Sequence, residues 1–168
     1  MKIDVICVGK IKEKFYRDAL DEYKKRLSKY CNLNIIEVQD EKTPDKASAV
    51  EEAEIKRKEG EKILKYIGNG TVKGAADGKS YVITLEINGK EIDSVELSKK
   101  IDSLGISGVS RIQFVIGGSL GLADEVIGRA DYHLSFSKMT FPHQLMRVIL
   151  LEQIYRSYRI IAGEPYHK

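Results

Sequence analysis

Residues 111–122 read RIQFVIGGSLGL, an apolar run that ends in closely spaced glycines. Its β-branched and aromatic residues are typical of a buried strand. Similar runs occur at residues 2–9 (KIDVICVG), 33–38 (LNIIEV), 81–87 (YVITLEI) and 132–137 (YHLSFS). Helical spacing separates them, at residues 13–30, 44–67, 93–104, 123–129 and 142–162. Because intervening helices imply crossover connections, the sequence predicts one α/β domain over residues 1–168, with a mostly parallel sheet flanked by helices.

Local signals set the expected boundaries of these elements. Thr43 followed by Pro44 predicts the start of the second helix, and Asp93 with Glu96 forms a capping box for the third. Asn88-Gly89 predicts a turn after the third strand. Gly163 is expected to end the last helix.

The composition is that of an ordinary globular protein, with 42% hydrophobic and 32% charged residues among 168. Two cysteines, Cys7 and Cys31, are too few for a disulfide framework. The N-terminus does not resemble a signal peptide, and no run approaches the roughly 18 apolar residues of a membrane span. We therefore expect a cytoplasmic protein without membrane contact. No zinc-type spacing of histidines and cysteines is present, so no metal is expected.

The formal net charge is only +3, but both ends of the chain are basic. Residues 10–30 hold eight basic against four acidic residues, and residues 138–168 hold five against two. Such surfaces attract phosphate-bearing polymers through counterion release. A solvated helix face explains the first stretch equally well.

Common nucleotide-binding motifs are absent. The GKS at residues 78–80 lacks the glycine spacing of a P-loop and precedes a strand, not a helix. No G-x-G-x-x-G follows the first strand, and no G-x-S-x-G occurs. The glycines at 117, 118 and 121 remain, at the carboxyl end of a buried strand where open α/β sheets bind ligands. A tight turn without a ligand would explain them as well.

The last helix is apolar almost all the way round. At 100° per residue, one face carries His143, Arg147, Leu150, Leu151, Ile154 and Tyr158, and most of the rest is covered by Leu145, Val148, Ile149, Tyr155 and Ile161. A helix of this kind needs cover on all sides, whereas its own sheet covers one side. This pattern predicts a twofold homodimer. Cover by a loop is the alternative.

Three late motifs carry a resemblance to a known family: VIGGSLGL (115–122), LSFSKMTFPHQLMRVILLEQIYR (134–156) and the closing PYHK (165–168). In this order and spacing they resemble the bacterial SPOUT methyltransferases that methylate N3 of a pseudouridine in a hairpin of large-subunit (23S) ribosomal RNA. The opening 26 residues and TLEINGK (84–90) are similar too, so the likeness spans the chain. Residues 71–79 depart from the family as an extra loop.

The resemblance implies a C-terminal trefoil knot, a homodimer acting on the ribosome, and S-adenosyl-L-methionine bound at the dimer interface. The implied cofactor contacts are Leu85, Gly117, Phe136, Ser137, Lys138, Met139, Thr140 and Phe141. The expected catalytic groups are Arg156 for charge, and Tyr166 and His167 for holding the target base, with His143 and Arg147 at the mouth of the site. The expected RNA contacts are Arg147, Lys10, Lys12 and Lys168. In this family the tail reaches the partner's site. Glu152 lies four residues before Arg156, a spacing that suits an ion pair orienting Arg156. A purely structural pair at the interface is the alternative.

Two other functions are compatible with parts of the sequence. A non-enzymatic RNA-binding or ribosome-associated factor would share the basic surface, but it would not need the glycine turn or the loop at residues 136–141. A nucleotide-dependent hydrolase would need a P-loop or a metal-binding set of carboxylates. A thermal shift with S-adenosylmethionine separates the first rival from the enzyme.

Overall fold

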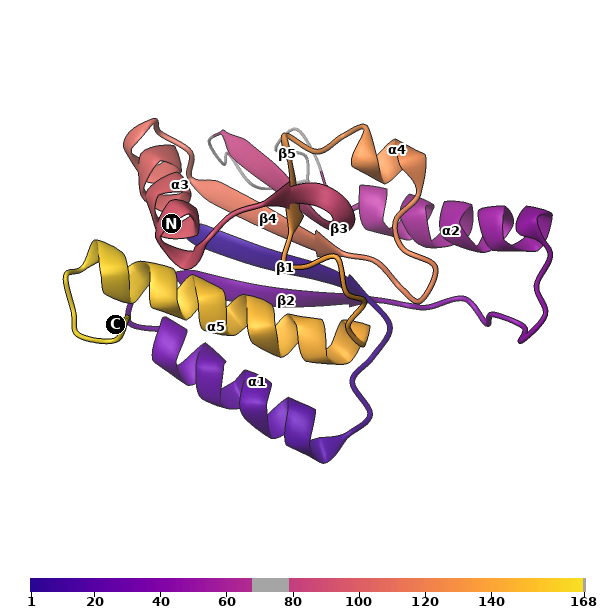
Figure 1. Ribbon diagram of the computed structural model, residues 1–168, viewed down its shortest axis with the longest axis horizontal. Coiled ribbons are helices and arrows are strands. Elements are labelled where there is room, and N and C mark those ends of the chain that lie inside the picture. The colour runs from indigo at the N-terminus through magenta and orange to yellow at the C-terminus, as the bar shows by residue number, and fades with distance from the viewer. Residues whose placement is uncertain (68–78, 168) are drawn as a thin grey trace.

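The computed structural model describes residues 1–67 and 79–167 (Figure 1). Its elements in chain order are β1 (Lys2–Val8), α1 (Lys14–Leu27), β2 (Asn32–Val38), α2 (Ala49–Leu64), β3 (Ser80–Glu91), α3 (Ser94–Ile106), β4 (Arg111–Ile116), α4 (Asp124–Ile127), β5 (Tyr132–Ser135) and α5 (His143–Ile161). The strands form one sheet in the order β2-β1-β4-β3-β5, and every neighbouring pair is parallel. The predicted α/β class and parallel sheet are confirmed.

Both faces of the sheet are covered, which explains why the central strands read as continuous apolar runs. On one face Ile3, Val5 and Cys7 pack with residues of α1, α3 and α5. On the other, Ile6 and Val8 pack with residues of α2 and α4. Figure 1 shows α1 and α5 side by side on the first face. Parallel strands place their carboxyl ends at one edge, so the loops after β1, β3, β4 and β5 can share a site.

The second helix begins later than predicted. The hydroxyl of Ser48 accepts a hydrogen bond from Glu51 N, and the Glu51 carboxylate accepts one from Ser48 N, so this capping box starts α2 at Ala49. The Thr43-Pro44 prediction was wrong because the box five residues later satisfies two helix-start N–H groups at once. Gly60 inside α2 has a packing reason: a Cβ there would lie 2.8 Å from that of Ala123.

The predicted turn at Asn88-Gly89 was also wrong, because β3 continues to Glu91. Its pairing with β5 shifts register between Leu85 and Lys90, so residues 86–89 form an irregularity within the strand. A Cβ on Gly89 would lie 2.7 Å from the backbone carbon of Leu134. The glycine therefore permits close approach to β5 inside the irregular segment.

The cysteine and end-of-helix predictions agree with the structure. Cys7 and Cys31 are free and buried, and burial raises the pKa of each thiol to about 11. Gly163 directly follows Ala162, the C-cap residue of α5. Its φ of 65° is the left-handed conformation that glycine commonly adopts at the end of a helix. No helix in the described ranges is long and apolar enough to cross a membrane.

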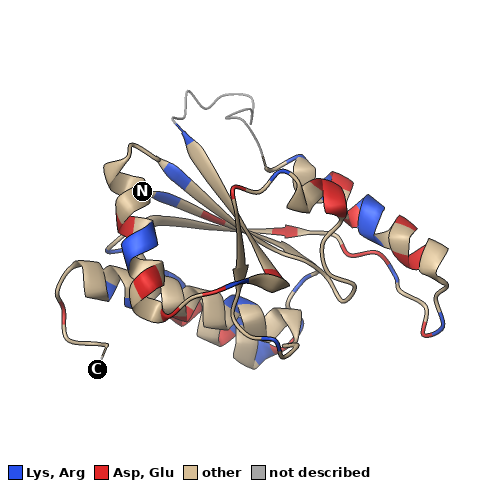
Figure 2. Ribbon diagram, turned by 45° about the horizontal axis from the view of Figure 1, so that its top comes forward, with Lys and Arg blue, Asp and Glu red and all other residues tan. Residues whose placement is uncertain are grey.

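Basic residues of α1 are largely paired within the helix. Lys14 contacts Asp18, Lys24 contacts Asp21, and Arg26 contacts Glu22. Figure 2 shows both charge signs mixed along α2 as well. A solvated helix face therefore explains much of the basic charge of α1.

Two predictions fall outside the described residues: the extra loop at residues 71–79, except its last residue, and Lys168 as an RNA contact. The trefoil knot concerns threading, which strand order does not test, and it stays a prediction.

Candidate functional site

A tight glycine turn follows β4. Gly121 N donates to Gly118 O at 3.1 Å, and Gly121 has a φ of 84°. A Cβ on Gly117 would lie 2.6 Å from the backbone carbon of Gly121, and one on Gly118 would lie 2.9 Å from Oε2 of the buried Glu59. A side chain at Gly117 would force the turn open, whereas one at Gly118 would displace the Glu59 carboxylate. Gly117 is therefore required by the shape of the turn.

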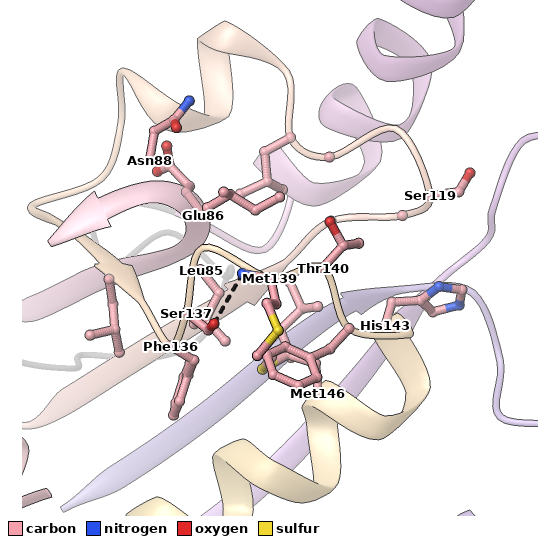
Figure 3. Close-up of a pocket in the computed structure, with 18 of the residues that line it drawn as sticks. Leu85, Glu86, Asn88, Ser119, Phe136, Ser137, Met139, Thr140, His143 and Met146 are labelled. Carbon is pink, nitrogen blue, oxygen red and sulfur yellow. Dashed lines mark hydrogen bonds between the residues drawn. The ribbon is translucent and has the colours of Figure 1, made fainter. Parts of the chain in front are cut away.

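The loop after β5 folds toward the same edge. The Ser135 hydroxyl lies 3.1 Å from the carbonyl oxygens of Ile87 and Ser137, which ties the loop to β3. Met139 N donates to Ser137 Oγ at 3.0 Å, the dashed line in Figure 3. These bonds shape residues 136–141 into a compact loop facing the end of β3.

The glycine turn, the end of β3 and this loop enclose one cavity of about 280 Å³. Seven of the eight predicted cofactor contacts line it: Leu85, Gly117, Phe136, Ser137, Met139, Thr140 and Phe141. Lys138 is the exception, because its exposed side chain is not part of the lining. The wall is mainly apolar, with polar groups from Glu86, Asn88 and Ser119 (Figure 3). An apolar cavity with a few polar groups suits a flat heterocycle joined to a polar tail.

His143, at the start of α5, lines this cavity and a smaller one beside Asp40 and Glu59. Burial, and then the charge of Arg147, lower its pKa below the usual 6.5, against the opposing effect of Asp40 and Glu13. The imidazole is therefore neutral at neutral pH. Its Nε2 would lie 3.6 Å from a Cβ on Gly9, which places the exposed Lys10 and Lys12 close to the same edge.

Arg147 does not lie at the mouth of the site as predicted. Its side chain is fully buried, and its guanidinium donates to Glu37 Oε1 at 2.8 Å and to the carbonyl oxygens of Val8 and Gly9 at 2.7 Å. These bonds use its charge to fasten α5 to the ends of β1 and β2. The expectation of an RNA contact is corrected, because a buried and bonded guanidinium cannot reach a phosphate.

A second group of predicted residues gathers at the far end of α5. Arg156 Nη2 lies 2.5 Å from Glu152 Oε1, and its Nη1 lies 3.4 Å from His167 Nδ1. The Arg156 guanidinium stacks 4.8 Å from the centre of the Tyr166 ring, whose hydroxyl donates to Glu152 at 3.3 Å. The Glu152 carboxylate raises the pKa of Arg156. The orienting role predicted for Glu152 fits this geometry.

These two groups do not meet within one chain. Arg156 follows His143 by 13 residues, about 20 Å along a straight helix. The side of α5 between them carries half-buried apolar residues, Leu145, Val148 and Ile149. This stripe joins the cavity to the Arg156 cluster and is left partly uncovered.

Sequence reasoning missed Glu86 and Asn88 as cavity residues. The signal was present in TLEINGK, where polar residues directly follow the buried part of a strand. The turn predicted at Asn88-Gly89 placed Asn88 outside the strand and Glu86 at its end. Within the described ranges, no group of three potential metal ligands is present.

Comparisons with known proteins agree with this geometry. A family model described as "Predicted SPOUT methyltransferase" matches residues 1–167. Proteins named "Ribosomal RNA large subunit methyltransferase H" from Clostridium novyi and Clostridium acetobutylicum are 61% and 60% identical over the full length of both chains. A solved tRNA methyltransferase from Aquifex aeolicus shares the fold at 13% identity, with a TM-score of 0.53 over 100% of this chain and 75% of that one. The chain belongs to the SPOUT methyltransferase family.

Proposed function

We propose that this protein methylates large-subunit ribosomal RNA in the cytoplasm, at N3 of a pseudouridine, with S-adenosylmethionine as methyl donor. The observation that carries the proposal is the convergence of three strand-end segments on one cavity. Relatives at about 60% identity over their whole length carry the name of a large-subunit ribosomal RNA methyltransferase.

The cavity residues fit the donor chemically. Leu85, Phe136 and Phe141 offer apolar surface for an adenine ring, and Gly117 lines the same cavity in a turn that has no room for a side chain. When bound, S-adenosylmethionine would supply an electrophilic methyl group, with S-adenosylhomocysteine as the leaving group and water taking up the N3 proton. The chain's own contribution is alignment, which is worth about 7–11 kcal/mol in well-oriented reactions.

Each active site is assembled from two chains in this proposal. The cavity of one protomer would face Arg156, Tyr166 and His167 of its partner across the apolar stripe on α5. Arg156 would stabilise the negative charge that develops on the base carbonyls as the proton leaves. The neutral imidazole of His143 lies on the cavity side. Exposed Lys10 and Lys12 would contact RNA phosphates.

Labelled methyl transfer to ribosomes that lack the modification tests the activity. The expected product is a pseudouridine methylated at N3 in large-subunit RNA. Protein that binds ribosomes and transfers no label would instead support the RNA-binding factor. A chain lacking residues 165–168 should bind S-adenosylmethionine normally and transfer no methyl group.

A mixing experiment tests the two-chain site. Gly117→Ala damages the cavity, and Arg156→Ala removes the charged group, so each variant alone should be inactive. In a mixed dimer one site combines the intact cavity of one chain with the intact Arg156 of the other. Equal mixing with subunit exchange should therefore restore about a quarter of wild-type activity. If the mixture stays inactive although mixed dimers form, each site lies within one chain.

A further inference from the structure

One ionisable acid lies in the wall of the cavity. Glu86 is the only carboxylate among the described residues that line it, and its side chain is 18% exposed. Asn88 lies beside it in Figure 3, on the side of the cavity opposite α5. A charged carboxylate in a mainly apolar wall is costly unless it is bonded or meets a ligand.

Two neighbouring side chains hold this carboxylate in place. The buried Thr84 hydroxyl donates to Glu86 Oε1, and His133 Nδ1 lies 2.7 Å from the same oxygen. Because a carboxylate oxygen only accepts, His133 carries its hydrogen on Nδ1. Within the described ranges Oε2 accepts no hydrogen bond from the protein. One oxygen is therefore fixed, and the other remains for a ligand.

The backbone around Glu86 is also fixed. The register shift in β3 begins directly after Leu85, and the close approach of Gly89 to β5 closes the irregular segment. Glu86 and Asn88 thus lie in a short irregular segment that is anchored to β5 on both sides. Anchoring of this kind helps to position a binding group.

We propose that Glu86 recognises the ribose hydroxyls of the methyl donor, with Thr84 and His133 as its positioning residues. The inference rests on the proposed function. Leu85 and Glu86 both line the cavity, so an adenine on the apolar surface of Leu85 would have its directly attached ribose beside Glu86. A vicinal diol offers two O–H donors, which match an acceptor-only carboxylate. The ammonium group at the far end of the donor is the alternative occupant.

Competition binding tests the assignment without any RNA. Adenosine and 2′-deoxyadenosine compete with labelled S-adenosylmethionine, and the ratio of their inhibition constants is measured. Wild-type protein should prefer adenosine by about tenfold or more, as expected for a hydrogen bond to a charged group. Glu86→Gln should bring the inhibition constants of the two competitors within about threefold. Thr84 and His133 would hold the amide oxygen, so the NH2 group, which cannot accept a hydrogen bond, would face the ribose. Glu91→Gln, an exposed glutamate on the same strand, is the matched control and should keep the wild-type ratio.

The positioning residues have their own test. His133→Asn keeps an N–H donor near Nδ1 and should retain the preference for adenosine, whereas His133→Phe should lower it. Thermal unfolding of each variant shows whether it is folded. A merely structural role for His133 would weaken both competitors equally and leave the ratio unchanged.

The outcomes separate the inference from the proposed function. Wild-type protein that does not bind S-adenosylmethionine would refute the proposed function itself. Normal donor binding with no preference between the two nucleosides would overturn only the role of Glu86. If Glu86→Gln weakens S-adenosylmethionine but not 5′-methylthioadenosine, which keeps the ribose and lacks the ammonium, the carboxylate binds the ammonium and the ribose assignment is wrong.

Discussion

Replacing Arg147 with methionine tests whether this residue fastens the fold or contacts RNA. Methionine keeps the length of the apolar stem and removes the guanidinium. The carbonyl oxygens of Val8 and Gly9 would then lose their bonds to Arg147, and Glu37 would lose its ion pair. Breaking one side of a buried ion pair costs about 3–5 kcal/mol. Arg147 Nε is buried without a hydrogen-bond partner in the described part of the chain, so we expect the lower end, about 3 kcal/mol.

For a chain of 168 residues, about 3 kcal/mol lowers Tm by roughly 6–12 °C. The assay is thermal and urea unfolding at one fixed protein concentration, because dimerisation would make Tm depend on concentration. Arg129→Met, on an exposed arginine, is the matched control and should change stability by less than about 0.5 kcal/mol. An Arg147→Met protein with wild-type stability and weaker ribosome binding would refute the structural role and restore the RNA contact.

Three further predictions concern the site. Gly117→Ala should reduce S-adenosylmethionine binding by at least about tenfold in calorimetry, because its Cβ would meet the turn backbone at 2.6 Å; normal affinity would show that the turn is not at the donor. Arg156→Ala should lower methyl transfer by about 10²-fold, while donor binding and the mass of the dimer stay unchanged. If the variant only loses its dimer, the pair of Arg156 with Glu152 has a structural role instead. Burial lowers the pKa of His143, so the unfolded chain binds more protons and stability should fall as pH drops below 6.5. His143→Gln should lose less stability between pH 7 and 5, and an identical pH profile would contradict this.

The sheet could be predicted because its central strands are buried on both faces. A strand covered by helices on each side is apolar at most positions, and the buried positions of β1 and β4 fit this apart from Asp4, Arg111 and Gln113. Such runs are visible without any tertiary knowledge. The boundary of α2 was predictable too, since Ser48 and Glu51 have the spacing of a capping box. Thr43-Pro44 is a competing start signal for the same helix, and local signals alone do not rank two candidate helix starts.

Errors arose where long-range contacts override local preference. Asn88-Gly89 favours the end of a strand in isolation, but β3 resumes its pairing with β5 at Lys90. Arg147 shares a helix face with His143 in the sequence, yet its partners lie 110–139 residues away. Helical periodicity gives the face on which a residue lies, and it does not give the acceptors that face will meet. The burial of an arginine therefore could not be read from its own segment.

The candidate site shows the same division. Glycines at a strand end pointed to the cavity from the sequence alone, whereas the residues of its loop came from family resemblance. The length of α5 explains why the remaining predicted residues, those of the Arg156 cluster, do not lie at the cavity of the same chain. A continuous helix from His143 to Ile161 holds the cavity and the Arg156 cluster about 20 Å apart, and no rotation of side chains closes that distance. If both groups act on one base, a second copy of the chain has to bring its Arg156 to the cavity of the first. The partly uncovered apolar stripe between them is the surface on which such a copy would pack.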